Sequence, residues 1–287
     1  MKIFIIGASG LIGQKLFIKL KKKFNVIGTY NSKKKNIQFI KFDLKKDKIS
    51  KIDKKIKSGD IFIILSAYSN PGWISKNKDE ARLLNITMTK KLIDQIITLN
   101  CKVIFMSSVE VFNGKKSFFI EKDKPDPLNY YGKAKYEIEK YIQKKTENFV
   151  ILRTSWNSDE ILHKRCVIEL TYNTLKNKNA KMAKNNFFSI TNVNDTCEII
   201  QKHLRSKKKI VHISNREKIS RSILAKKIKE YSNRKLDFDI VDHKEIKYIE
   251  PRAKINLLKS RDKISKNYNY KKMDVLIKKK VKLLDKT

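Results

Sequence analysis

The sequence predicts an α/β fold, in which a doubly wound parallel sheet carries a smaller C-terminal lobe. Three observations support this. Short apolar runs alternate with segments of helical period through the first half of the chain, as in repeated strand–helix units. These runs lack strict alternation, which favours strands covered by helices on both faces. The first run also leads directly into a glycine-rich turn that opens a helix.

The first half follows this rhythm closely. Runs rich in Ile, Val and Phe predict the strands, and apolar positions three and four apart predict the helices. The expected strands are Lys2–Ile6, Val26–Thr29, Ile37–Phe42, Ile61–Leu65, Val103–Met106 and Phe149–Leu152, and the expected helices are Leu11–Lys22, Glu80–Leu99 and Tyr131–Lys144.

The pattern loosens beyond Arg153, which predicts two parts. Residues 1–155 would form the sheet domain, and residues 156–287 mainly a cap with segments that return to the main sheet. In this second part we expect helices near Glu160–Leu175, Asn194–Leu204, Arg221–Tyr231 and Met273–Leu284, and strand-like segments at Phe187–Ile190, Lys209–Ile213 and Leu236–Val241.

Composition excludes several classes of protein. With 287 residues, 40% of them hydrophobic, the chain can bury a sizeable core and is not wholly disordered. The net charge is +38, but the lysines are spread along the whole chain rather than gathered in one arm. A solvated cationic surface explains this distribution, so we expect no specific nucleic-acid partner. A basic nucleic-acid-binding protein on the same fold stays an alternative, with strongly salt-dependent binding.

Cysteine and histidine spacing indicates neither a disulfide framework nor a metal site. The cysteines are scattered and odd in number, which fits a reducing cytoplasm. The histidines lie too far apart for zinc-ligand spacing. These residues are Cys101, Cys166 and Cys197, and His163, His203, His212 and His243. No apolar stretch approaches the roughly 20 residues that span a bilayer. We therefore expect a cytoplasmic protein without a membrane span.

The glycine-rich turn spans residues Gly7–Gly13 with the spacing GxxGxxG. Glycine allows the tight turn and the close approach of backbone to a pyrophosphate, which then lies at a helix N-terminus. Its place between an apolar strand and a helix favours a dinucleotide over a bare strand–helix turn. The expected contacts are Gly7, Ser9, Gly10, Leu11, Ile12 and Gly13.

The end of the second strand bears on the choice of cofactor. No acidic residue stands there to hold a ribose 2′-hydroxyl, whereas Asn31, Ser32 and Lys33 offer donors and charge for a 2′-phosphate. We expect NADP(H) to be preferred and NAD(H) to be possible; these lysines could equally be ordinary surface charge. Asp43 and Leu44 are expected beside the adenine, and Ser66 and Ala67 along the cofactor cleft.

A YxxxK motif, Tyr131 and Lys135, begins the third predicted helix. Residues four apart share a helix face, and a neighbouring ammonium favours the phenolate, which lowers the pKa of a tyrosine. Ser107 and Ser108 close the fifth strand, where Ser108 could donate to a substrate carbonyl oxygen. YxxxK arises often by chance in a lysine-rich chain, but its position makes Ser108, Tyr131 and Lys135 the candidate catalytic residues.

These motifs resemble the extended short-chain dehydrogenases/reductases, and among them the dTDP-4-dehydrorhamnose reductases. The matching segments are Gly7–Gly13, Ser107–Ser108, Val111–Gly114, Pro127–Lys135 and Arg153–Trp156. The resemblance implies a Rossmann-type sheet with a C-terminal substrate-binding lobe. It also implies NADPH-dependent reduction of a nucleotide-linked 4-keto-6-deoxy sugar, in dTDP-rhamnose biosynthesis for cell-surface polysaccharide. Tyr131 would supply the proton, Ser108 hold the oxygen, and Lys135 tune Tyr131 and hold the nicotinamide ribose.

Substrate contacts are expected from Ser107, Glu110, Trp156 and Arg252, although core packing is an equal alternative for Trp156. Glu110 stands where these reductases carry a tyrosine, as in related dehydratases. Val109 occupies the position of the dehydratase general acid and cannot transfer a proton, which argues against a 4,6-dehydratase.

Two further alternatives remain open. One is an NAD-dependent nucleotide-sugar epimerase, which would use the same tyrosine and lysine. The other is a non-catalytic NADP-binding regulatory subunit. A homodimer is possible.

Overall fold

The computed structural model describes residues 1–162 and 166–287. Its centre is a seven-stranded sheet in the order β11-β6-β5-β4-β1-β2-β3, and all of its neighbouring strands are parallel. The strands are β1 Lys2–Ile6, β2 Asn25–Tyr30, β3 Ile40–Lys41, β4 Ile61–Ile64, β5 Lys102–Ser108, β6 Phe149–Thr154 and β11 Ile210–Ile213. The strand order reverses between β1 and β4, and such switch points bind ligands at the carboxyl edge. The predicted doubly wound α/β fold is confirmed.

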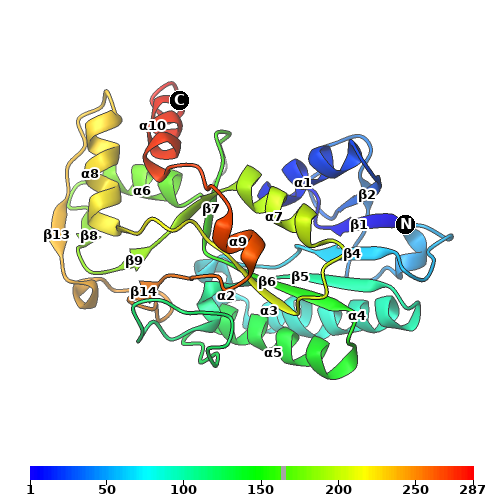
Figure 1. Ribbon diagram of the computed structural model, residues 1–287. Coiled ribbons are helices and arrows are strands. Elements are labelled where there is room, and N and C mark those ends of the chain that lie inside the picture. The colour runs from blue at the N-terminus through cyan, green and yellow to red at the C-terminus, as the bar shows by residue number, and fades with distance from the viewer. Residues whose placement is uncertain (163–165) are drawn as a thin grey trace.

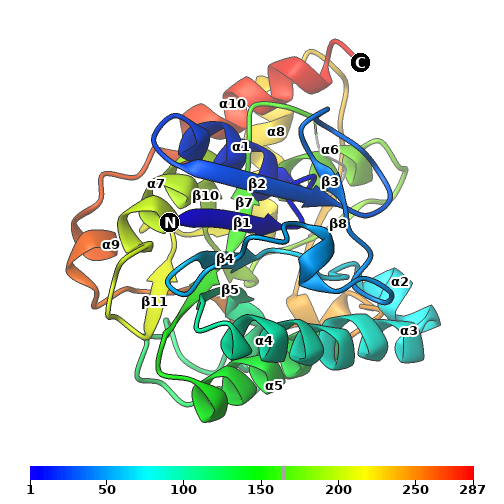
Figure 2. The ribbon, with the colours of Figure 1, turned by 90° about the vertical axis from the view of Figure 1, so that its right-hand side faces the viewer.

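Helices cover both faces of this sheet, as Figures 1 and 2 show. On one face α1 (Leu11–Lys21) packs beside α7 (Val193–His203), and on the other α4 (Thr89–Thr98) packs beside α5 (Tyr130–Lys145). Each face has its own apolar core, because the strand side chains alternate between the two. This arrangement explains why the strands are apolar along their whole length.

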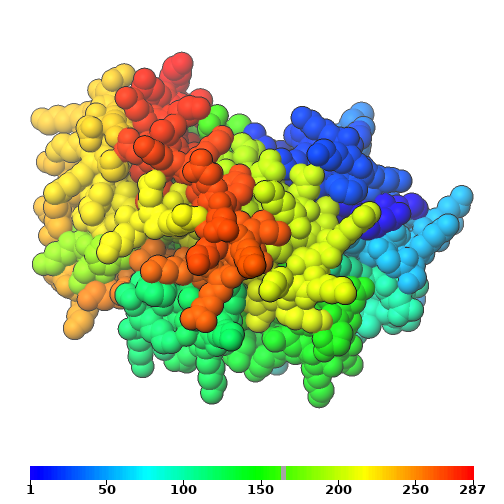
Figure 3. All heavy atoms as spheres, in the orientation of Figure 1, coloured from blue at the N-terminus to red at the C-terminus, as the bar shows by residue number. Residues whose placement is uncertain are grey.

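The second part of the chain forms a cap beside one end of the sheet. Its core lies among α6 (Val167–Leu175), α8 (Arg221–Tyr231) and α10 (Met273–Leu284). Its small sheets pair β7 (Trp156–Ser158) with β10 (Ile190–Asn192), β8 (Lys181–Ala183) with β13 (Asp239–Val241), and β9 (Phe187–Phe188) with both β12 (Ile219–Ser220) and β14 (Ile255–Asn256). Figure 3 shows the orange chain around α9 (Lys263–Asn267) lying over the middle of the molecule.

Short segments connect these elements. They are η1 Ile49–Lys51, α2 Pro71–Lys76, α3 Lys78–Arg82, η2 Leu83–Met88, η3 Val109–Val111 and η4 His243–Glu245. The division of the chain at residue 155 stays a proposal: β6 ends at Thr154, but β11 returns from the second part to the central sheet.

Five predicted boundaries were wrong. Phe187–Ile190 is divided between β9 and β10, which belong to different sheets. Ile37–Phe42 is reduced to Ile40–Lys41, since Ile37 is 86% exposed and has no core to join. Glu80–Leu99 is divided by the π-helical η2, where the Asn85 side chain bonds both backbone groups of Tyr68 and Thr89 donates to the Leu84 carbonyl. The strand predicted within Leu236–Val241 begins only at Asp239.

The helix predicted from Glu160 begins at Val167 instead, as α6. His163, within that predicted range, lies outside the described residues. Cys101, Cys166 and Cys197 are free and buried. Across residues 1–162 and 166–287, no helix is long and apolar enough to cross a membrane, and no group of three His, Cys, Asp or Glu side chains could hold a metal ion.

Candidate active site

The glycine turn joins β1 to α1 under tight steric limits. Gly7 has a φ of +87°, and a Cβ there would lie 2.9 Å from the Ser66 backbone nitrogen. A Cβ at Gly13 would lie 2.5 Å from the Gly7 carbonyl oxygen. Gly10 caps α1 without a side-chain hydrogen bond. A helix N-terminus that no side chain caps is suited to an anionic phosphate.

The residues expected around the adenine and its ribose follow β2 and β3. Asn31, Ser32 and Lys33 are exposed and follow the end of β2 directly. Asp43 accepts a hydrogen bond from the Lys45 backbone nitrogen, and Leu44 packs against the core beneath α4 and α5. These residues lie at the same edge of the sheet as the glycine turn, since the carboxyl ends of parallel strands share one edge.

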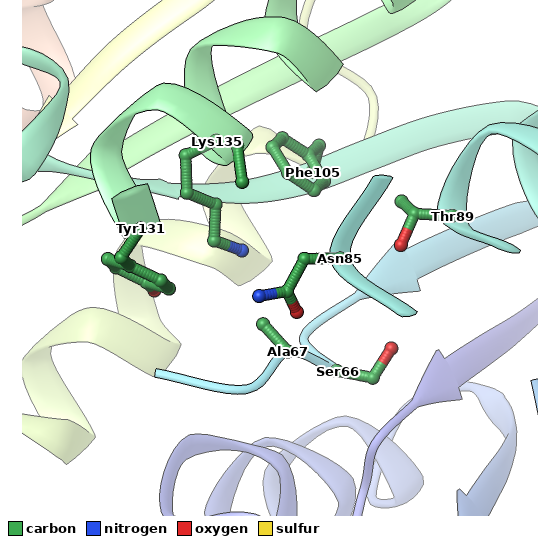
Figure 4. Close-up of a pocket in the computed structure, with 8 residues that line it drawn as sticks. Ser66, Ala67, Asn85, Thr89, Phe105, Tyr131 and Lys135 are labelled. Atoms are coloured by element: carbon green, nitrogen blue, oxygen red, sulfur yellow. The ribbon is translucent and has the colours of Figure 1, made fainter. Parts of the chain in front are cut away.

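A small cavity of about 10 Å³ marks the carboxyl edge between β4 and β5. Side chains from the segment after β4 and from η2, α4, β5 and α5 surround it (Figure 4). The lining residues are Ser66, Ala67, Asn85, Thr89, Phe105, Tyr131, Ala134 and Lys135. The Ser66 hydroxyl is buried and has no hydrogen-bond partner within the described part of the chain. The cavity therefore brings the expected cleft residues Ser66 and Ala67 to the YxxxK pair.

Tyr131 and Lys135 project from one face of α5 toward this cavity. The Lys135 ammonium donates to the Met106 carbonyl at 2.8 Å and lies 5.7 Å from the centre of the Tyr131 ring. Burial lowers the pKa of Lys135 to about 8, although the Glu139 carboxylate opposes this shift. A cation fixed beside a phenol stabilises its ionised form, which suits Tyr131 to proton transfer.

The serines at the end of β5 have different surroundings. Ser108 is partly exposed, and its hydroxyl accepts from the Glu110 backbone nitrogen at 3.2 Å. Ser107 is buried and donates to Glu139 on α5. The Glu110 carboxylate accepts from the Asn129 side chain at 2.7 Å. Ser108 is therefore the serine with solvent access at this edge, while Ser107 and Glu110 bond to the protein itself.

Sequence reasoning missed a buried ion pair beneath the site. Arg153 on β6 donates from Nε and Nη2 to the two oxygens of Glu139, at 2.9 and 2.6 Å. The Glu139 side chain is fully buried, and that of Arg153 is 2% exposed. The one signal in the sequence was the position of Glu139, one helical turn after Lys135. This pair fixes α5, which carries the candidate catalytic residues, to the sheet.

Two arginines meet inside the cap. Arg221, at the start of α8, donates to the Thr171 hydroxyl at 2.8 Å and stacks 5.0 Å from the Phe188 ring. Burial, together with repulsion from Arg252, lowers the pKa of Arg221 to about 10. Among the described residues, neither arginine has a carboxylate within 4.0 Å. The sequence predicted Arg252 as a substrate contact and missed Arg221, because only the fold brings them together.

Trp156, the other expected substrate contact in the cap, is partly buried. It packs against the core formed by α6, α8 and α10 and pairs with Ile190 across two strands. The contacts of the Trp156 side chain are therefore those of a residue that packs against the cap core.

Residues 1–271 match the model of a known protein family, described as the RmlD substrate binding domain. The chain belongs to this family. It is 26% identical over 154 residues to methionine adenosyltransferase 2 subunit beta of Xenopus tropicalis, which covers 53% of the chain and 46% of that relative. The RmlD-family chain thus spans about half the length of the curated relatives it matches.

Solved structures resemble the RmlD-family chain over most of its length. A hypothetical dTDP-4-dehydrorhamnose reductase of Sulfolobus tokodaii is 26% identical, with a TM-score of 0.75 and 90% and 92% of the two chains covered. A dTDP-4-dehydrorhamnose reductase of Bacillus anthracis in complex with NADP is 23% identical, with a TM-score of 0.76 and 90% of each chain covered. The UDP-glucuronic acid 4-epimerase of Bacillus cereus, with UDP-glucuronic acid and NAD, is 19% identical, with a TM-score of 0.84 and 99% and 100% covered. At such identities the last two show a shared fold.

Proposed function

We propose that this chain reduces a keto group on a nucleotide-linked 4-keto-6-deoxy sugar, using NADPH. The observation that carries the proposal is the Tyr131–Lys135 pair, which faces a cavity at the carboxyl edge beside the glycine turn. Phenol, ammonium and serine hydroxyl at that edge suit proton transfer to a carbonyl oxygen. Membership of the RmlD family supports the same class of reaction.

The glycine turn fits a dinucleotide, since it opens α1 at an N-terminus that no side chain caps and that suits a pyrophosphate. Gly7–Gly13 would hold the pyrophosphate, Asp43 and Leu44 would lie beside the adenine, and Ser66 and Ala67 would line the cleft. The exposed Asn31, Ser32 and Lys33 would favour the 2′-phosphate of NADPH over NADH. When bound, the cofactor supplies the hydride, and the protein supplies orientation and charge.

The side chains of this chain would then divide the remaining work. Tyr131 gives its proton to the carbonyl oxygen, and Ser108 donates a hydrogen bond to the same oxygen. Lys135 stabilises the phenolate that remains. Arg221 and Arg252 would hold the diphosphate of the substrate, because two guanidinium groups without a carboxylate partner match two negative charges. Ser107, Glu110 and Trp156 would support this site through their contacts with the protein.

A non-catalytic regulatory subunit is the second candidate. The observation that favours it is the likeness of the chain to a protein named as a subunit of methionine adenosyltransferase 2. Such a subunit would bind NADP on the glycine turn without needing Tyr131.

The deciding experiment measures oxidation of NADPH, and separately of NADH, with dTDP-4-keto-6-deoxy sugars. Tyr131→Phe should lower kcat by at least about 100-fold, the usual size of a lost general acid, with NADPH affinity unchanged. Tyr130→Phe is the matched control: within the described residues its hydroxyl is buried without a partner, so activity should be retained.

Three other outcomes of this assay would contradict part of the proposal or favour another function. Equal rates with NADH would contradict the preference for NADPH. Tight NADP binding without reduction would favour the regulatory subunit. Isomerisation of the sugar without net oxidation of the cofactor would favour an epimerase.

A further inference from the structure

One segment of the cap, residues 250–256, reaches back to the helix that carries Tyr131; we call it the cap strap. The Glu250 carboxylate accepts from the Tyr130 backbone nitrogen, the first residue of α5, at 3.1 Å. The Pro251 carbonyl accepts from the Asn129 side chain at 3.2 Å. Two groups of the strap thus bind the N-terminal end of the catalytic helix.

Asn129 connects the strap to the end of β5. Its Oδ1 caps α5 by accepting from the Gly132 backbone nitrogen at 2.9 Å, while its Nδ2 also donates to the Glu110 carboxylate at 2.7 Å. The Glu110 backbone nitrogen in turn donates to the Ser108 hydroxyl. A Cβ on Gly132 would lie 2.0 Å from the Glu110 carbonyl oxygen. The turns that carry Ser108 and Tyr131 are therefore in backbone contact.

The strap is equally well fixed on its cap side. The Ala253 carbonyl accepts from the Asn186 side chain at 3.1 Å, and the Lys254 carbonyl accepts from the Phe187 backbone nitrogen at 2.8 Å. Arg252, one of the two cap arginines, lies between these anchors and Glu250 in the sequence. An anion bound by Arg252 would therefore contact a segment that is hydrogen-bonded at both ends.

The charge of Glu250 matches its place. A carboxylate at a helix N-terminus is stabilised by the partial positive charge of the first backbone N–H groups. Glu250 is half-buried, and among the described residues it has no Lys, Arg or His partner within 4.0 Å. Within the described part of the chain, its side chain is hydrogen-bonded to the N-terminus of α5.

We propose that Glu250 is a positioning residue that couples occupation of the cap arginines to the placement of Tyr131. A diphosphate held by Arg221 and Arg252 adds a further restraint to the strap, and this strengthens the contact by which Glu250 holds the first turn of α5 against the Ser108 turn. This proposal rests on the proposed function for the identity of the ligand, but the contact between strap and helix does not depend on it.

Kinetics of Glu250→Ala and Glu250→Gln give the first test. Losing a helix N-terminal acceptor costs about 1 kcal/mol, so Glu250→Ala should lower kcat about fivefold, with the NADPH dissociation constant unchanged. Glu250→Gln should recover part of the rate, since its amide oxygen still accepts from Tyr130 but carries no negative charge. Glu245→Ala is the matched control, because that carboxylate accepts from Asp242 within its own turn, and it should keep the wild-type kcat.

Hydrogen exchange of the backbone amides at Tyr130–Gly132 gives a second test that needs no turnover. In the NADP-bound protein, these amides should exchange faster in Glu250→Ala than in wild type or Glu245→Ala. Adding dTDP should slow them in wild type and not in Glu250→Ala.

The outcomes separate the two proposals. Equal exchange in all three proteins, or a Glu250→Gln variant as slow in turnover as Glu250→Ala, would overturn the role of Glu250. Absence of dTDP binding would contradict both the nucleotide-sugar substrate and the coupling. Absence of turnover with the expected exchange pattern would contradict the reductase alone.

Discussion

Arg153 and Arg221 are two sequestered guanidinium groups in different parts of the molecule, and their surroundings are opposite. Arg153, in the central sheet, is held by both oxygens of Glu139. Arg221, in the cap, contacts a hydroxyl and an aromatic ring and is repelled by Arg252. The sheet supplies its own counter-charge, whereas the cap leaves two positive charges near each other. The first arrangement serves the scaffold, and the second suits an anion that arrives from outside.

This comparison predicts that two kinds of substitution change the free energy of unfolding in different directions. Removing the partner of a buried charge leaves that charge unpaired, which is costly in free energy. Removing a charge that has no carboxylate partner relieves repulsion and desolvation, and mainly harms the binding of the anion that it serves. The experiments that follow test this difference, beginning with the largest expected effect.

Glu139→Ala should lower the free energy of unfolding by about 3–5 kcal/mol, because it leaves the Arg153 guanidinium buried without a counter-charge. Denaturant unfolding at neutral pH measures this. Glu137→Ala on the same helix is the matched control: Glu137 pairs with Lys90, and its side chain is 40% exposed, so the loss should be under about 1 kcal/mol. Similar losses of unfolding free energy in the two variants would show that the buried Glu139–Arg153 pair contributes no more to stability than the exposed Glu137–Lys90 pair.

Arg221→Met should leave the stability unchanged or raise it, since a desolvated cation is removed. We expect the KM for the nucleotide sugar to rise about 10- to 100-fold, the loss of one charged hydrogen-bonding partner of about 1.5–3 kcal/mol, with NADPH affinity unchanged. The exposed Arg234 donates to the Asp285 carbonyl, and Arg234→Met controls for the loss of a positive charge. An Arg221→Met variant that is less stable but binds substrate normally would assign this arginine to the scaffold.

The sequence predicted what depends on local pattern. Gly7–Gly13 could be recognised because a strand, a turn and a helix follow one another, and Tyr131 with Lys135 because a helix places residues four apart on one face. These features lie where expected. The doubly wound sheet was equally predictable, since strands covered on both faces are apolar throughout.

The remainder depends on contacts between segments distant in the chain. Arg221 meets Arg252, and Glu250 meets Tyr130, only after the cap has folded onto the sheet. The long helix predicted over Glu80–Leu99 is interrupted because Asn85 bonds the backbone of Tyr68, seventeen residues earlier. Hydrophobic periodicity carries no signal for such pairings, so the sequence could propose a candidate site but not the charged residues around it.

The last predicted effect appears only in acid and concerns His212, which lies beside Arg153 in the sheet register. Burial and the Arg153 charge hold the pKa of His212 below its usual 6.5, although Glu121 opposes them. The unfolded chain therefore takes up this proton first as the pH falls, and stability is lost below pH 6.5 by up to about 1.4 kcal/mol per pH unit. His212→Leu cannot take up the proton, so its unfolding free energy should depend less steeply on pH than that of wild type between pH 7 and about pH 5. Parallel pH profiles would instead mean that folding leaves the pKa of His212 unchanged. If His212→Leu lost more stability than wild type as the pH falls, folded His212 would be charged and paired with Glu121, and the sheet would again supply its own counter-charge.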